Sequence, residues 1–198
     1  MRLVLASGNR GKLAELRGLL GELPLNVQAL GDFTAEAAEE TAPSFVENAI
    51  LKARFAAAAC GLPALADDSG LEVDALAGAP GVHSARYAGP AAHDAANRAK
   101  LLQQLADVPV DRRTARFRCV LVYLRHATDP WPQIFSGTWE GRIAPVEAGQ
   151  HGFGYDPLFW LPEHGCTAAQ LEPSDKARLS HRAQAAQALR AFLQAQLA

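Results

Sequence analysis

The chain has 198 residues, of which 49% are apolar and 20% are charged, and its net charge at pH 7 is -2. This length can support one substantial hydrophobic core, so we expect a single domain over residues 1–198. The charge argues against general nucleic-acid binding, which usually needs a basic domain, and no apolar run approaches the roughly 20 residues that span a bilayer.

The three cysteines, Cys60, Cys119 and Cys166, lie far apart and lack the spacing of a metal site. Cys60 and Cys119 occur among apolar residues, where buried thiols are the simplest interpretation. The first apolar segment, residues 2–6, is too short for the core of a signal peptide. These features predict a reduced, cytosolic protein that binds no membrane.

The N-terminal third predicts an α/β architecture, in which short apolar runs alternate with segments of helical period. Residues 2–6 predict a buried strand. A polar loop that contains glycine follows this strand. A helix is then indicated by the spacing of Leu13, Leu16, Leu19 and Leu20.

A better-marked helix is predicted to start at Ser44. This residue forms a capping-box pattern with Glu47, and Gly61 provides a helix end. Residues 62–66 then predict a second short strand. We expect that strand to end at the polar stretch Asp67-Asp68-Ser69-Gly70.

The second half of the chain predicts a hairpin and two further helices. Residues 92–105 and 181–197 have helical spacing, and Ser180 is a capping candidate for the last helix. Residues 114–124 and 134–143 are expected to be strands joined by a turn. A hairpin beside the N-terminal strands implies a mixed sheet.

The loop between the first strand and the first helix is a candidate anion site. Its residues are Ser7, Gly8, Asn9, Arg10, Gly11 and Lys12. Backbone N–H groups at a helix N-terminus attract phosphate, and Lys12 adds a full charge. The segment does not match a Walker A loop, and a tight turn with a solvated lysine is an equal alternative for this segment alone.

Two acidic pairs are candidate metal ligands. Glu39-Glu40 precedes the second helix, and Asp67-Asp68 follows the second strand. Adjacent carboxylates repel each other, whereas Mg²⁺ would stabilise them and needs only one or two protein carboxylates when phosphate and water complete its coordination. Taken alone, Glu39-Glu40 is better interpreted as solvated acids, whereas Asp67-Asp68 at a strand end favours function.

An aromatic loop at residues 151–157 places Phe153 and Tyr155 next to glycines. Such a loop lets a flat ligand approach and stack, although core packing of both rings is an equal alternative. Further along, Lys176 and the pair His181-Arg182 are candidate hydrogen-bond donors. Taken alone, they would be interpreted as a surface lysine and an ordinary first helical turn. The order of these groups along the chain favours an anionic nucleotide with a metal.

Several collinear motifs resemble the non-canonical purine NTP pyrophosphatases, also called dITP/XTP or inosine triphosphate pyrophosphatases. They are Ser7-Gly8-Asn9-Arg10-Gly11-Lys12, Phe45-Val46-Glu47-Asn48-Ala49 with Lys52 and Ala53, Ala66-Asp67-Asp68-Ser69-Gly70-Leu71, Gly78-Ala79-Pro80-Gly81, Ser84-Ala85-Arg86-Tyr87, Phe153-Gly154-Tyr155-Asp156-Pro157 and Ser180-His181-Arg182. Together they cover nearly the whole chain and are highly specific. Ser7 stands where the family often has threonine, and the serine keeps the hydroxyl group.

The resemblance implies an α/β fold with a long mixed β-sheet, flanking helices and two lobes around a deep nucleotide cleft. It also implies a homodimer, while the composition and charge predict a cytoplasmic protein that binds no nucleic acid. The implied reaction is Mg²⁺-dependent hydrolysis of dITP, ITP and XTP to the monophosphate and pyrophosphate.

The matching motifs also imply roles for individual residues. Ser7 to Lys12 would hold the triphosphate, and Asp68 would be both a metal-side acid and the proton acceptor. Glu39 would be the second metal-side acid, with Glu40 as an open alternative. The remaining substrate contacts would come from Lys52, Ser69, Phe153, Gly154, Tyr155, Asp156, Lys176, His181 and Arg182.

Release of pyrophosphate requires water to attack the α-phosphorus. Asp68 is expected to orient or deprotonate that water, while Lys12, Lys52 and the loop amides stabilise the leaving group. Donors near the C-terminus that face a 6-keto oxygen would reject the 6-amino group of adenine. The rival functions are a phosphotransferase, against which the missing Walker A pattern weighs, and a nucleotide sensor, which would not need the acidic pair.

Overall fold

The structure is a computed structural model that describes residues 1–21 and 23–197. In this part of the chain the strands are β1 (Arg2–Ala6), β2 (Asn26–Ala29), β3 (Ala64–Val73), β4 (Thr114–Leu124), β5 (Gln133–Ile143), β6 (Phe159–Leu161) and β7 (Cys166–Thr167). The α-helices are α1 (Arg10–Leu20), α2 (Phe45–Cys60), α3 (Asp94–Gln104), α4 (Pro173–Leu179) and α5 (His181–Leu197).

These strands form one mixed sheet in the order β2-β1-β3-β4-β5-β6-β7. β1 pairs in parallel with both β2 and β3, because helices α1 and α2 carry the chain back between these strands. β6 pairs antiparallel with β5 and β7. The predicted α/β class, the mixed sheet and the flanking helices are therefore confirmed.

The chain divides into two compact units. Unit 1 consists of Met1–Asp68, Cys119–Gly137 and Arg182–Ala198, and unit 2 consists of Ser69–Arg118 and Thr138–His181. β3, β4 and β5 each contribute residues to both units. The two units agree with the two lobes that the resemblance implies, whereas the deep nucleotide cleft and the single domain over residues 1–198 stay predictions.

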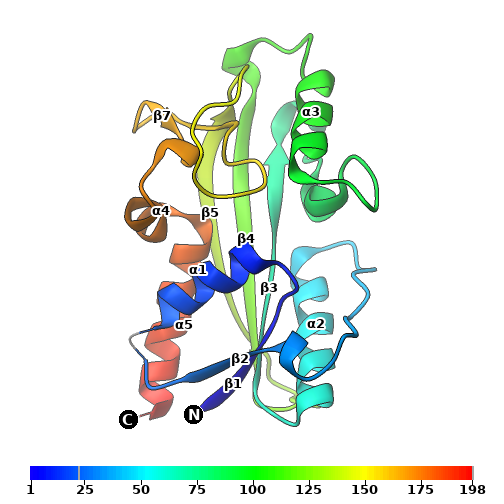
Figure 1. Cartoon of the computed structure of the whole chain (residues 1–198), viewed down its shortest axis with the longest axis vertical. Coiled ribbons are helices and arrows are strands. Elements are labelled where there is room, and N and C mark those ends of the chain that lie inside the picture. Colours follow the sequence, from blue (N-terminus) through cyan, green and yellow to red (C-terminus); the bar gives the residue numbers. More distant parts are fainter. Residues whose placement is uncertain (22, 198) are drawn as a thin grey trace. The chain divides into compact units, whose positions relative to one another are not determined.

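In unit 1, helices cover both faces of the sheet (Figure 1). Successive residues of a strand point to opposite faces. Leu3 and Leu5 of β1 accordingly pack with α1 and α5, whereas Val4 and Ala6 pack with α2. The strand is apolar on both sides because both of its faces are covered.

The helices α1 and α2 begin at capping residues. The Asn9 side chain accepts a hydrogen bond from the backbone N–H of Lys12 at 3.0 Å. The predicted Ser44 and Glu47 pair is present, with the Glu47 N–H donating to the Ser44 hydroxyl at 3.3 Å. Gly61 ends α2 with a φ of 63°, in the left-handed region that favours glycine.

Unit 2 has its own hydrophobic core. It joins β3, β4 and α3 through Leu71, Val73, Phe117, Leu101 and Leu105. The charged residues that alternate with Phe117 along β4, Arg116 and Arg118, pair with carboxylates of Asp74, Glu140 and Glu72. This half of β4 is therefore apolar on one face only, as its alternating sequence predicts.

The extent predicted for the second strand is wrong. The sequence predicts residues 62–66 with an end at Asp67, whereas β3 begins at Ala64 and continues to Val73. Acidic residues and glycine usually disfavour strands, but Asp67 and Asp68 are both buried here and each pairs with a lysine. The acidic pair therefore lies inside the sheet and not at the end of a strand.

The cysteines are free thiols. Cys119 is buried as expected, whereas Cys60, the last residue of α2, is only partly buried. Within the described residues, no helix combines the length and apolar character needed to cross a membrane.

Candidate functional site

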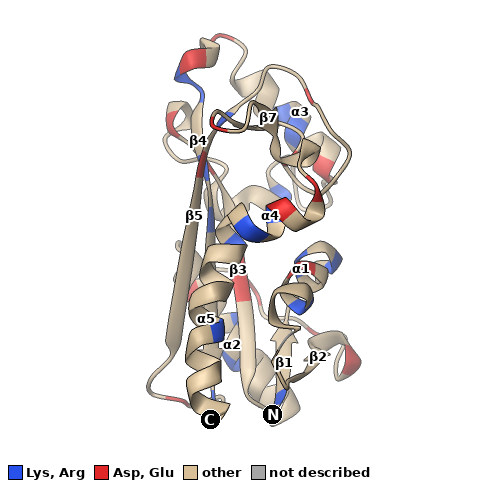
Figure 2. Ribbon diagram, turned by 90° about the vertical axis from the view of Figure 1, so that its left-hand side faces the viewer, with Lys and Arg blue, Asp and Glu red and all other residues tan. Residues whose placement is uncertain are grey.

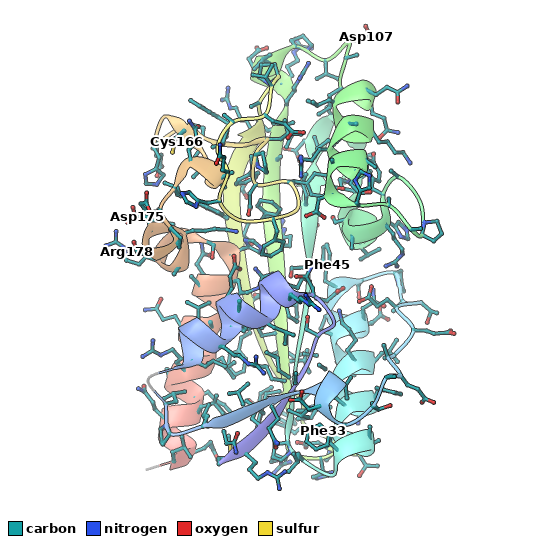
Figure 3. The ribbon with its side chains drawn as sticks, in the orientation of Figure 1. Phe33, Phe45, Asp107, Cys166, Asp175 and Arg178 are labelled. Carbon is teal, nitrogen blue, oxygen red and sulfur yellow. The ribbon has the colours of Figure 1, made fainter. Side chains whose placement is uncertain are left out.

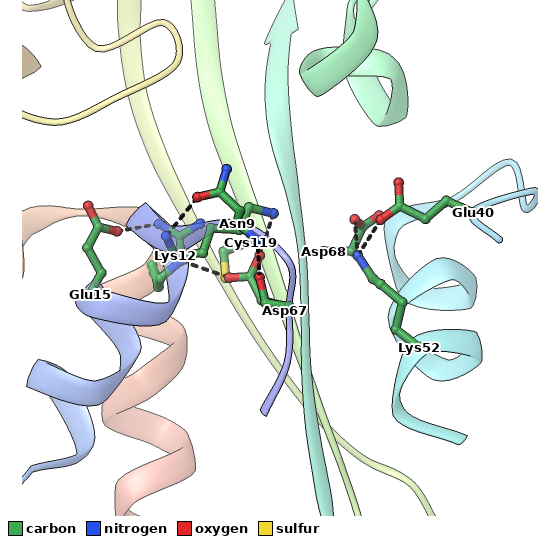
Figure 4. A network of polar contacts seen from close by, with 10 residues as sticks. Asn9, Lys12, Glu15, Glu40, Lys52, Asp67, Asp68 and Cys119 are labelled. Carbon is green, nitrogen blue, oxygen red and sulfur yellow. Dashed lines mark hydrogen bonds and ion pairs between the residues drawn. The ribbon is translucent and has the colours of Figure 1, made fainter. Parts of the chain in front are cut away.

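Asp67 and Asp68 point to opposite faces of the sheet in unit 1, as neighbouring residues of a strand must. Asp67 pairs with Lys12 of α1, and Asp68 pairs with Lys52 of α2 (Figure 4). Figure 2 shows the same arrangement by charge, with acidic residues in the middle of β3 and basic residues on α1 and α2. The interpretation of the two carboxylates as one repelling pair that shares a metal is therefore wrong.

On the side of α1 and α5, Asp67 binds two cations. Its Oδ1 lies 2.7 Å from Nζ of Lys12, and its Oδ2 lies 2.7 Å from Nε of Arg182. The Cys119 thiol donates to Oδ2 at 3.5 Å, and Arg182 also pairs with Glu15. Arg182 is thus a buried member of an ion network and not an ordinary residue of a first helical turn.

The cations determine the charge of Asp67. Burial alone would raise its pKa, but Arg182 and Lys12 outweigh that effect and hold the pKa well below its usual range. Burial would also lower the pKa of Arg182, but the groups around it, chiefly the Asp67 carboxylate, raise that pKa instead. Burial raises the pKa of the Cys119 thiol well above its usual value. The network is therefore a set of charged ion pairs next to a protonated thiol.

This network predicts a loss of stability in acid. Because the folded pKa of Asp67 lies below the unfolded value of about 3.9, its contribution is complete above that value and is lost as the pH falls toward the folded pKa. We expect the free energy of unfolding, measured by urea titration, to drop below about pH 4 in the wild type and to drop less in Asp67→Asn. Parallel pH profiles of the two proteins would contradict this expectation.

On the side of α2, Lys52 bridges Asp68 and Glu40. Its Nζ lies 2.7 Å from Oδ1 of Asp68 and 2.8 Å from Oε1 of Glu40. The segment that carries Glu40 is fixed by Asn48, a buried residue of α2. The Asn48 side chain accepts from the Ala42 N–H at 2.9 Å and donates to the Ala42 carbonyl at 3.2 Å. The structure thus brings Glu40 into the network, whereas Glu39 is exposed.

Asp68 keeps one buried oxygen, Oδ2, that has no hydrogen-bond partner within residues 1–21 and 23–197. Burial raises the pKa of Asp68, and Lys52 offsets that effect only in part. An unpaired buried carboxylate oxygen is costly unless a cation or water binds it. This oxygen therefore fits a hard divalent cation, which prefers oxygen ligands.

No group of three or more His, Cys, Asp or Glu side chains in the described part of the chain is arranged to hold a metal ion. A cation at Asp68 would therefore depend on substrate oxygens and water for the rest of its coordination. Mg²⁺ commonly binds in this way, through one or two carboxylates together with phosphate.

The predicted phosphate loop, residues 7–12, leads from β1 into α1. Gly8, Asn9 and Arg10 are exposed, and the Asn9 N–H donates to the Ser7 hydroxyl at 3.3 Å. The loop thus presents accessible backbone at a helix N-terminus, where phosphate is favoured. The alternative of a solvated lysine is wrong, because Lys12 pairs with the buried Asp67.

In unit 2, Asp156 is the centre of a second network. Its Oδ2 lies 2.5 Å from Nζ of Lys176 and accepts from the Phe153 N–H at 2.9 Å. Gly152 lies so close that a Cβ there would come within 2.0 Å of this oxygen. The Lys176 ammonium also lies 4.8 Å from the centre of the Phe153 ring. Lys176 is buried, so its interpretation as a surface lysine is wrong.

Two more of the predicted site residues, His181 and Tyr155, are buried in unit 2. The His181 ring stacks on Phe117 at 4.8 Å, and the Tyr155 hydroxyl donates to the Ser84 carbonyl at 2.9 Å. Phe153, by contrast, is only partly buried. Core packing therefore accounts for Tyr155, whereas Phe153 keeps a ring surface for a ligand.

Two residues of α3 fix Gly154, and neither was singled out in the sequence. Asp94 accepts from the Gly154 N–H at 2.7 Å, and Arg98 donates to the Gly154 carbonyl at 2.9 Å. Gly154 has a φ of 62°, which favours glycine. Acidic and basic residues four apart are common on exposed helices, so this spacing carries no signal of its own.

The predicted site residues are divided between the units. Unit 1 contains Ser7, Gly8, Asn9, Arg10, Gly11, Lys12, Glu39, Lys52, Asp68 and Arg182. Unit 2 contains Ser69, Phe153, Gly154, Tyr155, Asp156, Lys176 and His181. Within unit 1, ion pairs join Lys52 to Asp68 and join Lys12 to Arg182 through Asp67.

Sequence relatives agree with the resemblance that the motifs give. The model of the Ham1 family matches residues 3–192. A dITP/XTP pyrophosphatase from Vibrio cholerae serotype O1 is 54% identical over 188 residues, which are 95% of this chain and 94% of that protein. A dITP/XTP pyrophosphatase from Thioalkalivibrio sulfidiphilus is 57% identical over 194 residues, 98% of this chain and 99% of its own. The resemblance is therefore confirmed.

Solved structures agree with the fold. A HAM1 protein from Coxiella burnetii is 48% identical with a TM-score of 0.91, and the match covers 98% of both chains. The Staphylococcus aureus Ham1 protein is 40% identical with a TM-score of 0.87, over 99% of this chain and 100% of that one. Since the family model and these relatives span nearly the whole sequence, the chain belongs to the Ham1 family.

Proposed function

We propose that this chain is a Mg²⁺-dependent pyrophosphatase that hydrolyses dITP, ITP and XTP to the monophosphate and pyrophosphate. The substrate class comes from the relatives named dITP/XTP pyrophosphatase. The chemistry is carried by one observation: Asp68 is buried, binds Lys52 through one oxygen, and leaves the other without a hydrogen bond in the described residues. A single domain, a homodimer and a cytosolic location belong to the same proposal.

The groups of unit 1 are assigned to the triphosphate and the metal. Residues 7–12 and Lys52 offer N–H groups and positive charge to the phosphates. Asp68 orients or deprotonates the attacking water. Mg²⁺ held by Asp68 and by one of the two glutamates would neutralise charge on the phosphate oxygens.

The groups of unit 2 are assigned to the base. The partly buried Phe153 ring offers a stacking surface, and the Asp156 and Lys176 pair fixes the loop that carries it. The candidate donors are the first two residues of α5, His181 of unit 2 and Arg182 of unit 1. A base with a 6-keto oxygen would satisfy such donors, whereas the 6-amino group of adenine would leave them unpaired.

The two adjacent glutamates should differ in their effect on metal dependence. Glu40 lies in the network of Lys52 and Asp68, whereas Glu39 is exposed. We therefore expect Glu40→Gln to raise the Mg²⁺ concentration for half-maximal turnover by about 10-fold or more. Glu39→Gln, its matched control, should change that concentration little. A larger effect of Glu39→Gln would reverse the assignment.

A panel of nucleoside triphosphates tests the proposed function. ITP, dITP, XTP, ATP and GTP are incubated with Mg²⁺, and pyrophosphate and orthophosphate are measured separately. The first three should yield pyrophosphate, ATP and GTP should yield little, and chelation of the metal should stop the reaction. Orthophosphate as the main product, or equal rates on ATP and ITP, would contradict the proposal.

A further inference from the structure

We propose that Asp67 is a positioning residue for this reaction, which holds the Lys12 ammonium in place for the phosphates by tying it to Arg182. The inference rests on the proposed function, since it takes those phosphates to belong to the nucleotide substrate. Asp67 itself would touch no substrate atom and would act through Lys12.

The carboxylate of Asp67 joins three elements of unit 1, namely β3, α1 and α5 (Figure 4). Each oxygen has its own cation: Oδ1 lies 2.7 Å from Nζ of Lys12, and Oδ2 lies 2.7 Å from Nε of Arg182. These are the distances of charge-assisted hydrogen bonds. The head of Lys12 is therefore tied to the central strand of the unit and, through it, to α5.

The three side chains differ in exposure in the way that a positioning role requires. Those of Asp67 and Arg182 are 0% and 2% exposed, whereas that of Lys12 is 16% exposed. An anion that arrives from solvent can therefore contact Lys12, whose side chain is the most exposed of the three. A free lysine side chain has many rotamers, and fixing its head before binding removes part of the entropic cost of association.

Arg182 prevents the carboxylate from cancelling the charge of Lys12. Asp67 with Lys12 alone would be a neutral pair, which attracts phosphate weakly. Sharing one carboxylate between Lys12 and Arg182 leaves one positive charge on the three groups. Glu15 also pairs with Arg182, but its side chain is 25% exposed, so water screens its charge more than that of Asp67.

The direction in which Asp67→Asn changes the binding of a polyanion distinguishes a positioning role of Asp67 from a purely electrostatic one. If Asp67 acted only as a negative charge, Asp67→Asn would strengthen the binding of a polyanion, because a repulsion is removed. If Asp67 positions Lys12, the same variant weakens that binding. Glu15→Gln is the matched control, since it removes the other carboxylate that pairs with Arg182.

The test combines binding and turnover. The affinity for inorganic tripolyphosphate is measured by calorimetry, and KM and kcat are measured with ITP, for wild type, Asp67→Asn, Lys12→Met, the double variant and Glu15→Gln. Asp67→Asn should weaken tripolyphosphate binding and raise KM by about 10-fold, with a smaller change in kcat. When Lys12 is already methionine, adding Asp67→Asn should change either value by less than about twofold. Glu15→Gln should change both values by less than about threefold.

Tighter or unchanged tripolyphosphate binding in Asp67→Asn would overturn the inference. The inference would also be overturned if Asp67→Asn lowered the affinity equally in the wild-type and the Lys12→Met backgrounds. A wild-type protein that does not bind tripolyphosphate would overturn it as well. If Asp67→Asn fails to fold, as judged by thermal unfolding, Asp67→Glu replaces it, because it keeps the charge and shifts the carboxylate by one methylene. A wild-type protein that binds tripolyphosphate but releases no pyrophosphate from ITP would contradict the proposed function and leave this inference intact.

Discussion

Asp68→Asn is expected to lower kcat for ITP by about 10²- to 10⁴-fold, the range that general acid–base catalysis contributes. The amide keeps the shape of the side chain and an oxygen for the Lys52 ammonium, which lies 2.7 Å from Oδ1. It removes the charged oxygen that is offered to a metal and to water. Nucleotide binding should therefore change much less than turnover, and separate measurements of kcat and nucleotide affinity check both parts.

Asp74→Asn is a suitable control for this variant. Asp74 follows the same strand, but its side chain is 46% exposed and its partner is Arg116 on the surface of unit 2. Exposed ion pairs contribute little to stability, so Asp74→Asn should stay folded. Its kcat should therefore stay near the wild-type value. Near-normal turnover of Asp68→Asn would show that Asp68 is not the proton acceptor.

Lys176→Met is expected to lower the free energy of unfolding by about 3–5 kcal/mol, the cost of breaking a buried ion pair on one side. Lys176 and Asp156 are both buried, and the ammonium lies 2.5 Å from Oδ2. The variant leaves the Asp156 carboxylate without its cation, and the Phe153 ring loses the ammonium above it. KM for ITP should rise as well, because Asp156 also holds the backbone of Phe153.

The same short helix offers a control. Asp175 and Arg178 form an ion pair at the outer surface of α4, where their side chains are 39% and 76% exposed (Figure 3). Asp175→Asn should cost less than about 1 kcal/mol, with KM unchanged. Urea unfolding of both variants gives the comparison. Equal losses of stability would contradict a buried, structural role for Lys176.

The parts of the fold that depend on local sequence could be predicted. The caps at Ser44 and Gly61 and the apolar spacing of the first helix act within a few residues. The predicted bounds of the last helix, residues 181–197, agree with α5 for the same reason. Short strands such as β6 and β7 were not predicted, since two or three residues carry no periodic signal.

The role of Asp67 could not be predicted because its partners lie far away along the chain. Arg182 is 115 residues from Asp67, and no local pattern indicates that contact. Without these cations, two acids beside a glycine indicate the end of a strand. The alternation of side chains along a strand is one signal that the sequence does contain. A strand that continues to Leu71 and Val73 places Asp67 and Asp68 on opposite faces of the sheet.

The sequence motifs predict the residues of the candidate site but not their contacts. They indicate residues 7–12 and Asp68, and the structure adds which atoms of these residues form hydrogen bonds and ion pairs. The burial of Lys176 depends on Asp156, 20 residues earlier, and charged residues are usually exposed when no partner is known. The motifs imply Glu39 as the second metal-side acid with Glu40 as an alternative, whereas the contact of Glu40 with Lys52 favours Glu40.

The position at which water attacks tests the central claim most directly. ITP is hydrolysed in water enriched in oxygen-18, and the products are analysed by mass spectrometry. Attack on the α-phosphorus predicts one labelled oxygen in the nucleoside monophosphate and none in pyrophosphate. Label in pyrophosphate, or release of labelled orthophosphate, would contradict this account.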